Sequence, residues 1–322
     1  MNFLISGCGG FIGFHLTNYL CKKYVKSKIF GFDNLDNFYS VNLKKKRLKI
    51  LKKNKNFIFS KIDLNDKTKL LKIFNKNKID IVLHLAAQAG VRDSLKIPKK
   101  YFESNFLGYL NLINYSNNHN IKKFIFASSS SVYGDQKKYP LNEKMVITPK
   151  NIYSATKMVN ENIAEDISKN SKMKIVGLRF FTVYGEYGRP DMLIFKYLKS
   201  LLCNKKFSLY NKGKNYRDYT HIDDVIQIID KIILKNIKVK FDIFNICSKK
   251  PIDTFRIVKF ISRYLNTTTK FNLKKRNEIE VLKTHGDNKK VLKLINYKIE
   301  KDIFLELPKI IEWYKKNKIW KF

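Results

Sequence analysis

The sequence predicts an α/β fold, in which a doubly wound parallel sheet is followed by a smaller C-terminal domain. In the first half of the chain, short apolar runs alternate with longer stretches whose apolar residues recur every three to four positions. Strands that alternate with helices in this way indicate βαβ units and a parallel sheet. A glycine-rich turn joins the first apolar run to the first helical stretch.

Six apolar runs are expected to form the strands of this sheet. One of them, Ile79–His84, is apolar enough to be covered on both faces, as a buried parallel strand requires. Helical periodicity is clear over Leu64–Phe74 and Tyr101–Tyr115. The predicted strands are Asn2–Ser6, Lys28–Phe32, Asn56–Ser60, Ile79–His84, Lys122–Ala127 and Lys174–Leu178.

In the second half of the chain the alternation loosens. A loop rich in glycine and aromatic residues, Phe180–Pro190, leads into an expected helix at Asp191–Leu202. We expect residues 1–178 to form the sheet domain and 179–322 to form mainly the smaller domain, with a return of the chain to the first domain near 214–247. The remaining expected elements are a strand at Asp242–Asn245 and helices at Thr254–Leu265 and Ile303–Lys315.

The net charge of +38 comes from 65 Lys and Arg against 27 Asp and Glu. A nucleic-acid-binding protein would gather its cations, especially Arg, into one patch interleaved with aromatic residues. Here Lys is spread over every segment and Arg is scarce, while Asn, Ile, Phe and Tyr are also abundant. This pattern favours a shift of the whole composition over a nucleic-acid partner, although the charge would still attract small anions.

The sequence gives no sign of export or membrane insertion. No apolar run reaches the ~18–20 residues of a membrane span, and the N-terminus lacks the basic region of a signal peptide. The cysteines at positions 8, 21, 203 and 247 are scattered, with no CxxC pair and no His cluster. We therefore expect reduced thiols, no metal site and a cytoplasmic protein.

The glycine turn has the spacing Gly7-x-x-Gly10-x-x-Gly13. Glycine lets the backbone approach a pyrophosphate, and the helix N-terminus that follows supplies N–H donors and a positive dipole. Any tight strand-to-helix turn can also use glycine, but the position directly after the first strand favours nucleotide binding.

An acidic residue, Asp33, follows the second predicted strand. A carboxylate there can accept hydrogen bonds from ribose hydroxyls and would repel a 2′-phosphate, so it favours NAD over NADP. Asn34 comes next, with no arginine beside it, although an Asp-Asn pair can also simply form a turn. Asp63 and Leu64, after the third strand, can contact the adenine or form a helix cap.

Tyr153 and Lys157 lie four residues apart at the start of a predicted helix, so their side chains share one face. A phenol with a pKa near ~10 is a poor base at neutral pH. A nearby ammonium group and an oxidised nicotinamide would favour the phenolate, which is how a tyrosine becomes a general base. The spacing alone is common on protein surfaces, and it becomes informative in combination with the glycine turn.

A run of serines, Ser128–Ser131, ends the fifth predicted strand and continues into Val132-Tyr133-Gly134. Hydroxyls at the carboxyl end of a parallel strand lie where such sheets bind ligands. They can hydrogen-bond a sugar oxygen and pass on its proton, although a serine run can also simply mark a loop.

Together these motifs resemble, in the same order, those of the extended short-chain dehydrogenase/reductase family. The resemblance spans nearly the whole chain and implies a Rossmann-type sheet domain, a small C-terminal substrate-binding domain, tightly held NAD and a UDP-sugar substrate. It also implies a homodimer built from the helices near 98–119 and 151–169. The matching segments are Gly7–Gly13, His84–Gln88, Ser128–Gly134, Tyr153–Lys157 and Arg179–Gly185, and those closest to UDP-glucuronate 4-epimerases are Ala87–Arg92, Gly177–Gly185 and Gly188–Met192.

The resemblance assigns roles to single residues. Tyr153 would be the base, Lys157 would orient the nicotinamide ribose, and Ser129 would be the catalytic serine. The cofactor-binding positions that it implies are Gly7, Gly10, Phe11, Ile12, Gly13, Asp33, Asn34, Asp63, Leu64, Leu85, Ala86, Ala87, Gln88, Asn105, Tyr153, Lys157, Phe180 and Val183. The substrate-binding positions are Gln88, Arg92, Ser128, Ser129, Ser130, Tyr153, Thr182, Arg189 and Arg217.

Two of these assignments concern phosphate binding. Arg217 resembles the arginine that binds the UDP phosphates, a role that suits a guanidinium fork; a buried ion pair with Asp218 or Asp223 is the alternative. Relatives usually carry Gly-Asp-Val where this chain has Ile279–Val281, and Arg276 is the candidate second phosphate ligand there.

The residues before Val132 separate an epimerase from its relatives. Related dehydratases place Asp-Glu directly before Val-Tyr-Gly, and related decarboxylases place Glu there, whereas this chain has Ser130 and Ser131. The family then implies a 4-epimerase. Tyr153 takes the O4 proton while hydride passes from C4 to NAD, the 4-keto sugar rotates, and hydride returns to the opposite face.

The expected reaction interconverts UDP-glucuronate and UDP-galacturonate. A 4-keto uronate is a β-keto acid that readily loses carbon dioxide, so its carboxylate must be held; Arg189 is the candidate clamp, with help from Thr182 and the serines. Arg189 can instead merely brace its loop against Asp191. The alternatives are a 4-epimerase of UDP-glucose or an N-acetylated UDP sugar, and a non-catalytic NAD-binding regulator, which would have no reason to keep Ser129, Tyr153 and Lys157 together.

Overall fold

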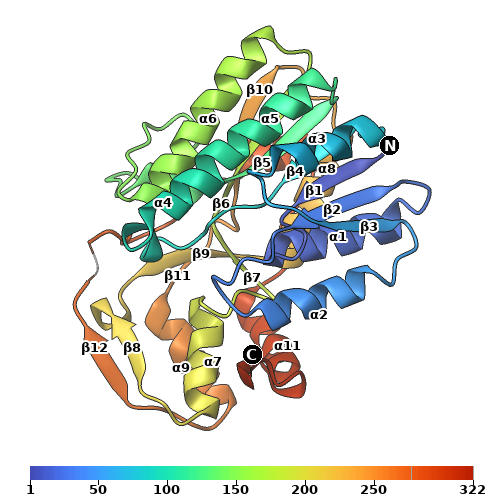
Figure 1. Cartoon of the computed structure of the whole chain (residues 1–322). Coiled ribbons are helices and arrows are strands. Elements are labelled where there is room, and N and C mark those ends of the chain that lie inside the picture. Colours follow the sequence, from blue (N-terminus) through green and yellow to red (C-terminus); the bar gives the residue numbers. More distant parts are fainter. Residues whose placement is uncertain (277, 322) are drawn as a thin grey trace.

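The computed structural model describes residues 1–276 and 278–321, and its centre is a seven-stranded sheet in which every neighbouring pair is parallel (Figure 1). The strand order is β10-β6-β5-β4-β1-β2-β3, so the chain runs outward from β1 in both directions. This is the doubly wound Rossmann-type order that the sequence predicts. The strands are β1 (Phe3–Ser6), β2 (Ile29–Asp33), β3 (Phe57–Lys61), β4 (Ile81–His84), β5 (Lys123–Ser129), β6 (Lys174–Phe180) and β10 (Phe241–Ile246).

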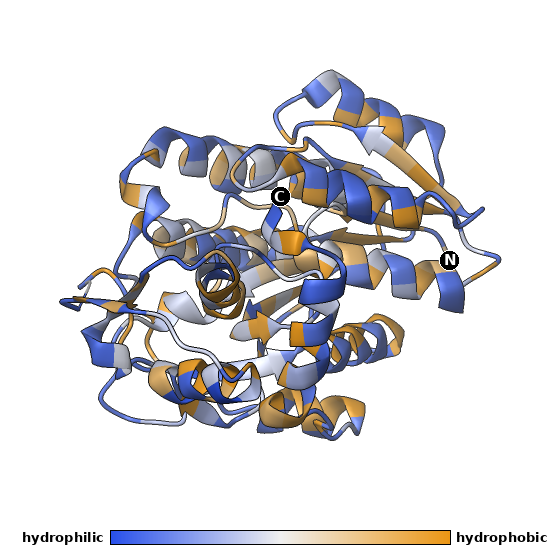
Figure 2. Ribbon diagram, turned by 90° about the horizontal axis from the view of Figure 1, so that it is seen from below, coloured by the Kyte–Doolittle hydropathy of each residue, from blue (hydrophilic) through white to orange (hydrophobic). Residues whose placement is uncertain are grey.

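Helices cover both faces of the sheet, and Figure 2 shows the hydrophobic strands enclosed between helices whose outer surfaces are hydrophilic. Side chains alternate along a strand, so Phe3 and Ile5 pack into one apolar cluster while Leu4 packs into another. One face is covered by α1 (Phe11–Lys23), α2 (Val41–Leu51), α8 (Ile222–Leu234) and α10 (Lys289–Ile295), and the other by α3 (Lys67–Lys76), α5 (Gly108–Asn118) and α6 (Ile152–Asn170).

A smaller assembly of strands and helices lies at the carboxyl edge of the sheet and has its own apolar cluster (Figure 1). Between its segments the chain passes through α8, which packs on α1, and β10, which pairs with β6. This passage overlaps the return predicted near 214–247, while the division into two domains stays a prediction. The small sheets are β7 (Thr182–Tyr184) with β9 (Tyr216–His221) and β11 (Pro251–Asp253), and β8 (Phe207–Tyr210) with β12 (Phe271–Lys274); the helices are α7 (Leu193–Leu202), α9 (Thr254–Tyr264) and α11 (Ile303–Lys316).

The predicted strands of the main sheet are confirmed with ends shifted by at most two residues, and two predicted helices are corrected. The helix expected from Leu64 begins only at Lys67, because Asp66 caps it by accepting a hydrogen bond from the Lys69 amide at 3.0 Å. The helix expected over Tyr101–Tyr115 is part of a longer stretch in which α4 (Pro98–Tyr101) passes through a π-helical turn, Phe102–Leu107, into α5.

Several elements are absent from the prediction, among them β7 and α8. Strand β7 lies inside the segment expected to be a loop, and α8 follows β9 without a Ser, Thr, Asp or Asn at its N-cap. The N-cap is His221, whose Nδ1 accepts a hydrogen bond from the Asp223 amide at 3.2 Å. In the described ranges, no helix is long and apolar enough to cross a membrane.

A buried histidine at the end of β4 makes stability depend on pH. The ring of His84 lies between Ser6, 2.7 Å from Nδ1, and the rings of Tyr109 and Phe124. Burial lowers the pKa of His84 to about 3. An unfolded histidine takes up its proton near pH ~6.5. Between these two values the unfolded chain binds more protons, so stability decreases as the pH falls.

We expect this one group to lower the free energy of unfolding by about 2 kcal/mol between pH 7 and pH 5. Urea denaturation at a series of pH values measures it. The variant His84→Asn, whose amide can replace Nδ1 toward Ser6, should flatten the slope in this window. An unchanged slope in that variant would assign the acid sensitivity to other groups.

Candidate active site

A cavity of about 1110 Å³ opens at the carboxyl ends of the sheet strands. Its walls come from the β1–α1 turn and the ends of β2, β4 and β5 on one side, and from β8, β9 and the segment 280–284 on the other. A site for one small ligand typically occupies roughly 300–1,000 Å³. The cavity is therefore large enough for more than one ligand.

The glycine turn forms one end of the cavity, and close packing requires its glycines. Gly7 has φ +73°, and a Cβ there would lie 2.7 Å from the Ala86 amide nitrogen. A Cβ on Gly13 would lie 2.1 Å from the Gly7 carbonyl oxygen. Helix α1 begins after its N-cap, Gly10, so its first N–H groups lie beside the cavity. This arrangement suits the pyrophosphate of a dinucleotide.

Asp33 lies at the end of β2 beside this turn and is held from two sides. Its Oδ2 accepts a hydrogen bond from the Gly9 amide at 3.1 Å, and its Oδ1 accepts one from the Leu35 amide at 2.8 Å. Asn34 donates to Asp63 at 2.7 Å. The carboxylate is thus fixed on the cavity wall, where ribose hydroxyls can reach it.

Arg47 of α2 is a buried residue of this region that the sequence analysis missed. Its Nη1 donates to the Gly9 carbonyl at 2.8 Å and its Nη2 to the Tyr187 carbonyl at 2.6 Å. The guanidinium therefore ties the glycine turn to the loop that follows β7. The only sequence signal is a single arginine among the lysines of that helix.

Tyr153, Lys157 and Ser129 come together at the other end of the cavity. Helix α6 presents the first two, and it begins after the N-cap Asn151, whose side chain accepts a hydrogen bond from the Ser154 amide at 2.9 Å. Lys157 Nζ donates to the Ala127 carbonyl at 2.7 Å, which fixes the helix against the end of β5. Ser129 lies close enough to Tyr153 to lower the pKa of its hydroxyl, and Ser129 Oγ itself accepts a hydrogen bond from the Ser131 hydroxyl at 2.9 Å.

Burial favours the uncharged form of both reacting groups. It raises the pKa of Tyr153, and the hydrogen bond with Ser129 and the positive charge of Arg189 offset only part of that effect. Burial also lowers the pKa of Lys157 to about 8, against the opposing charge of Glu161. A positively charged ligand beside Tyr153 would oppose the effect of burial and favour the phenolate.

A buried network behind the serines uses residues that the sequence analysis did not single out for the site. Glu161 receives two hydrogen bonds from Arg179, at 2.9 and 2.7 Å, and one from the Ser128 hydroxyl at 2.5 Å. Arg179 Nη1 also donates to the Tyr133 hydroxyl at 2.8 Å. The hydroxyl of Ser128 is thus directed to Glu161, although Ser128 borders the cavity. The four-residue spacing of Lys157 and Glu161 on α6 is the signal that points to this residue.

Arg189 lies on the cavity wall and is paired with Asp191. Its Nε donates to Asp191 Oδ1 at 3.0 Å and its Nη2 to Oδ2 at 2.6 Å. The bracing contact that the sequence left open is therefore present. Among the described residues none accepts a hydrogen bond from Nη1, so this nitrogen is available to a ligand.

Two further arginines line the opposite wall. Arg217 donates from Nη1 to the Tyr216 and Leu282 carbonyls, at 2.8 and 3.1 Å. Asp218 instead accepts from the amides of Ser248, Lys249 and Gly286, and no carboxylate of the described chain lies within ion-pair distance of Arg217. The alternative of a buried pair with Asp218 or Asp223 is thus wrong. Arg92 donates from Nε to Glu280 at 2.5 Å, and its guanidinium lies 3.9 Å from the centre of the Tyr210 ring.

The structure places nearly all predicted site residues on the cavity wall, and Asn105 is the exception. Asn105 is buried behind the wall, where its side chain accepts from the Gln88 amide at 2.7 Å and donates to the Gln88 carbonyl at 2.9 Å. It therefore positions the backbone of Gln88 and is not part of the wall. Arg276, the candidate second phosphate ligand, is also not a wall residue. The predicted residues on the wall are Gly7, Gly10, Phe11, Ile12, Gly13, Asp33, Asn34, Asp63, Leu64, Leu85, Ala86, Ala87, Gln88, Arg92, Ser128, Ser129, Ser130, Tyr153, Lys157, Phe180, Thr182, Val183, Arg189 and Arg217.

Comparison with known proteins identifies the family of this chain. Residues 3–247 match the NAD dependent epimerase/dehydratase family. The chain belongs to this family. NAD dependence, which the sequence predicts, is thereby confirmed. In the part of the chain that the structure describes, no three His, Cys, Asp or Glu side chains gather as a metal site.

Individual relatives of this epimerase/dehydratase are similar over the full length. An uncharacterized protein of Methanocaldococcus jannaschii is 41% identical and matches 99% of this chain and 98% of its own. A UDP-glucuronate 4-epimerase of Thermodesulfobacterium geofontis is 35% identical, over 98% and 96% of the two chains. The crystal structure of the UDP-glucuronic acid 4-epimerase of Bacillus cereus, in complex with UDP-glucuronic acid and NAD, superposes with a TM-score of 0.93 at 29% identity, over 98% and 100% of the two chains.

Removing one hydroxyl tests the reacting end of the cavity. We expect Tyr153→Phe to reduce turnover by roughly 10²–10⁴-fold, the range of general-base catalysis. Affinity for substrate should change little, because the ring and its contact with Tyr101 remain. Steady-state kinetics measures both, with Tyr264→Phe on the surface of α9 as the control. Full activity in Tyr153→Phe would show that another group accepts the proton.

Proposed function

We propose that this protein is an NAD-dependent 4-epimerase that interconverts UDP-glucuronate and UDP-galacturonate. The observation that carries the proposal is the cation Arg189 on the wall of the cavity that also contains Tyr153, close enough for its charge to lower the pKa of that tyrosine. The names of the relatives from Thermodesulfobacterium geofontis and Bacillus cereus support the uronate substrate.

The residues at the glycine end fit NAD. The first N–H groups of helix α1 would bind the pyrophosphate, and the carboxylate of Asp33 would accept hydrogen bonds from the ribose. The remaining contacts of Asp33, from the Gly9 and Leu35 amides, keep it in place for this purpose. Bound NAD would supply the acceptor, and later the donor, of the hydride at C4 of the sugar.

The residues at the other end move the proton. Tyr153 takes the proton of the sugar O4 hydroxyl and later gives it back, and Ser129, which lies beside the phenol on the cavity wall, shares that proton path. Lys157 is anchored to the Ala127 carbonyl, so its ammonium group stays beside the nicotinamide end of the cavity, where it can hold a ribose hydroxyl. Glu161, one helical turn further, balances the charge of Lys157 and Arg179.

A uronate carboxylate at this end meets a guanidinium whose orientation is already fixed. Asp191 binds Nε and Nη2 of Arg189 and leaves Nη1 toward the cavity. The hydroxyls of Thr182 and Ser130, also on the wall, add further donors. Holding the carboxylate away from alignment with the C4 carbonyl prevents loss of carbon dioxide from the 4-keto intermediate. The loop brace and the clamp are therefore compatible roles of Arg189.

We also propose a homodimer formed by α4, α5 and α6. The π-helical turn between α4 and α5 exposes Phe102 and Leu107, which are 51% and 38% accessible, and this apolar surface needs a partner. Sedimentation at twice the chain mass supports this arrangement, and a monomer contradicts it. A cytoplasmic location stays a prediction from the reduced cysteines, which are unpaired in the described chain.

Arg189→Ala distinguishes the uronate substrate from other UDP sugars. A charge-assisted hydrogen bond contributes roughly 1.5–3 kcal/mol, so we expect a loss of about 10- to 100-fold in kcat/KM for UDP-glucuronate. UDP-glucose, which has no carboxylate, should be affected far less, and the variant should release some UDP-pentose. Proton NMR of the C4 configuration over a panel of UDP sugars measures all three, with exposed Arg263→Ala as the control.

An equal loss toward all sugars, with no pentose product, would leave Arg189 only as a brace for its loop. A wild-type enzyme that prefers UDP-glucose would contradict the uronate substrate while leaving the epimerase mechanism in place.

A further inference from the structure

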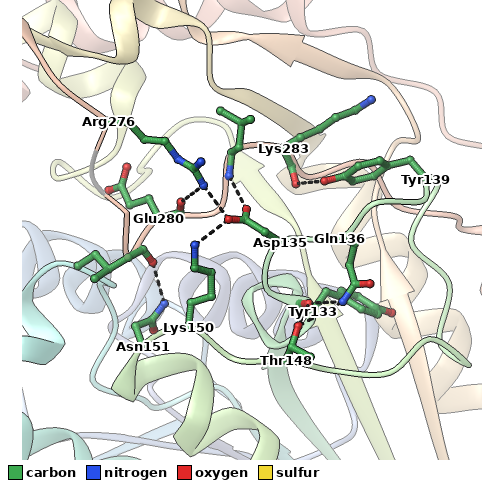
Figure 3. A network of polar contacts seen from close by, with 12 residues as sticks. Tyr133, Asp135, Gln136, Tyr139, Thr148, Lys150, Asn151, Arg276, Glu280 and Lys283 are labelled. Atoms are coloured by element: carbon green, nitrogen blue, oxygen red, sulfur yellow. Dashed lines mark hydrogen bonds and ion pairs between the residues drawn. The ribbon is translucent and has the colours of Figure 1, made fainter.

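A short segment near the C-terminus, residues 278–284, forms part of the cavity wall and is tied to the loop after the serine run (Figure 3). Glu280, Val281 and Thr284 of this segment face the cavity. The backbone of Tyr216 in β9 holds the segment on the cavity side, through hydrogen bonds with the Leu282 carbonyl and the Thr284 amide, both at 3.0 Å. On the other side the segment is held by Asp135, which lies outside the cavity and which neither the sequence analysis nor the proposed mechanism uses.

Asp135 binds three donors from three parts of the chain. Its Oδ2 accepts from Lys150 Nζ and from Arg276 Nη2, both at 2.7 Å, and its Oδ1 accepts from the Leu282 amide at 3.0 Å. Partial burial would raise the pKa of Asp135, but the hydrogen bonds from Lys150, Leu282 and Arg276 outweigh it and hold that pKa below its ordinary value. The carboxylate is therefore charged at neutral pH.

A second tie joins the same segment to the helix that carries the reacting groups. Asn151, the N-cap of α6, donates from Nδ2 to the Ile279 carbonyl at 3.2 Å (Figure 3). Arg276 Nη2 also donates, at 3.4 Å, to the Glu280 carbonyl. The segment is thus fixed on its outer side at Ile279, Glu280 and Leu282.

On its inner side, the same segment binds both arginines of the opposite wall. The Glu280 carboxylate accepts from Arg92 Nε at 2.5 Å, and the Leu282 carbonyl accepts from Arg217 Nη1 at 3.1 Å. Leu282 therefore connects Asp135 to Arg217, because its amide donates to Asp135 and its carbonyl accepts from Arg217. Glu280 connects Arg276 to Arg92, because its carbonyl accepts from Arg276 and its carboxylate accepts from Arg92.

We propose that Asp135 is a positioning residue for the diphosphate of the substrate: it holds the segment 278–284, and through it the guanidinium groups of Arg92 and Arg217. The inference rests on the proposed function, since it assigns these arginines to the phosphates of a UDP sugar. Asp135 itself contacts no ligand.

The charge of Asp135 is what this role requires. Lys150 and Arg276 are both cations that converge on one oxygen of the carboxylate. Without the negative charge they would repel each other, and the Leu282 amide would lose its acceptor. The segment would then be held only by β9 and Asn151, and the contacts of Leu282 and Glu280 with the two arginines would be less firmly fixed.

The experiment measures the affinity for UDP alone, which carries the diphosphate but no sugar, by calorimetry on the NAD-bound enzyme. We expect Asp135→Ala to raise the Kd of UDP by about tenfold, as when one charge-assisted contact is lost. Asp135→Asn, which keeps an acceptor for Leu282 but removes the charge, should have a smaller effect in the same direction. The KM for UDP-glucuronate should rise with UDP Kd, while kcat and the NAD content stay close to wild type. Asp166→Ala, which removes an exposed carboxylate paired with Lys169, is the control.

Arg276→Gln should weaken UDP binding to a similar extent as Asp135→Asn. The variant that combines Asp135→Asn with Arg276→Gln should lose no more UDP affinity than the more affected single variant. Wild-type affinity for UDP in Asp135→Ala would overturn the proposal, and so would a joint loss of UDP binding, NAD content and thermal stability. A wild-type enzyme that binds UDP without epimerising UDP-glucuronate would contradict the proposed function and leave this test intact. A wild type that binds no UDP would overturn both.

Discussion

The parallel direction of the seven strands is the constraint on which the site depends. Because every strand ends at the same edge, the glycine turn after β1, Asp33 after β2 and the serines after β5 meet in one cavity although they are far apart in the sequence. Both faces of the sheet are covered by helices, so the edge is where polar groups can reach a ligand. The smaller assembly then needs only to close this edge from the other side.

Buried charges give the cavity its chemistry, and Glu161 and Arg189 are held by specific partners. Glu161 is shared by Arg179 and Ser128, and it partly offsets the effect of burial on Lys157. Asp191 fixes two nitrogens of Arg189. Such pairs cost desolvation energy, so their value lies in orientation more than in stability. A site that must hold a reactive 4-keto sugar in two orientations gains from groups that cannot themselves rearrange.

Local patterns were sufficient to predict the strands of the sheet and their parallel direction, while the individual site positions came from the resemblance to a known family. The glycine spacing, the Tyr153–Lys157 pair and the serine run each place chemistry at the end of a strand or the start of a helix. The sequence was not sufficient where a side chain chooses between distant partners. Whether Ser128 faces a sugar or Glu161, and whether Asn105 faces a cofactor or Gln88, depends on packing between elements. Arg47 and Asp135 were missed for the same reason, since their partners lie in other loops.

In the proposed reaction, hydride leaves C4 and returns to C4 of the same sugar within one cavity. UDP-glucuronate deuterated at C4 is mixed with UDP-glucuronate that carries carbon-13 but no deuterium, and the UDP-galacturonate formed is analysed by mass spectrometry. The account predicts that deuterium stays at C4 of the carbon-12 product. Loss of deuterium to water, or its appearance in the carbon-13 product, would contradict it.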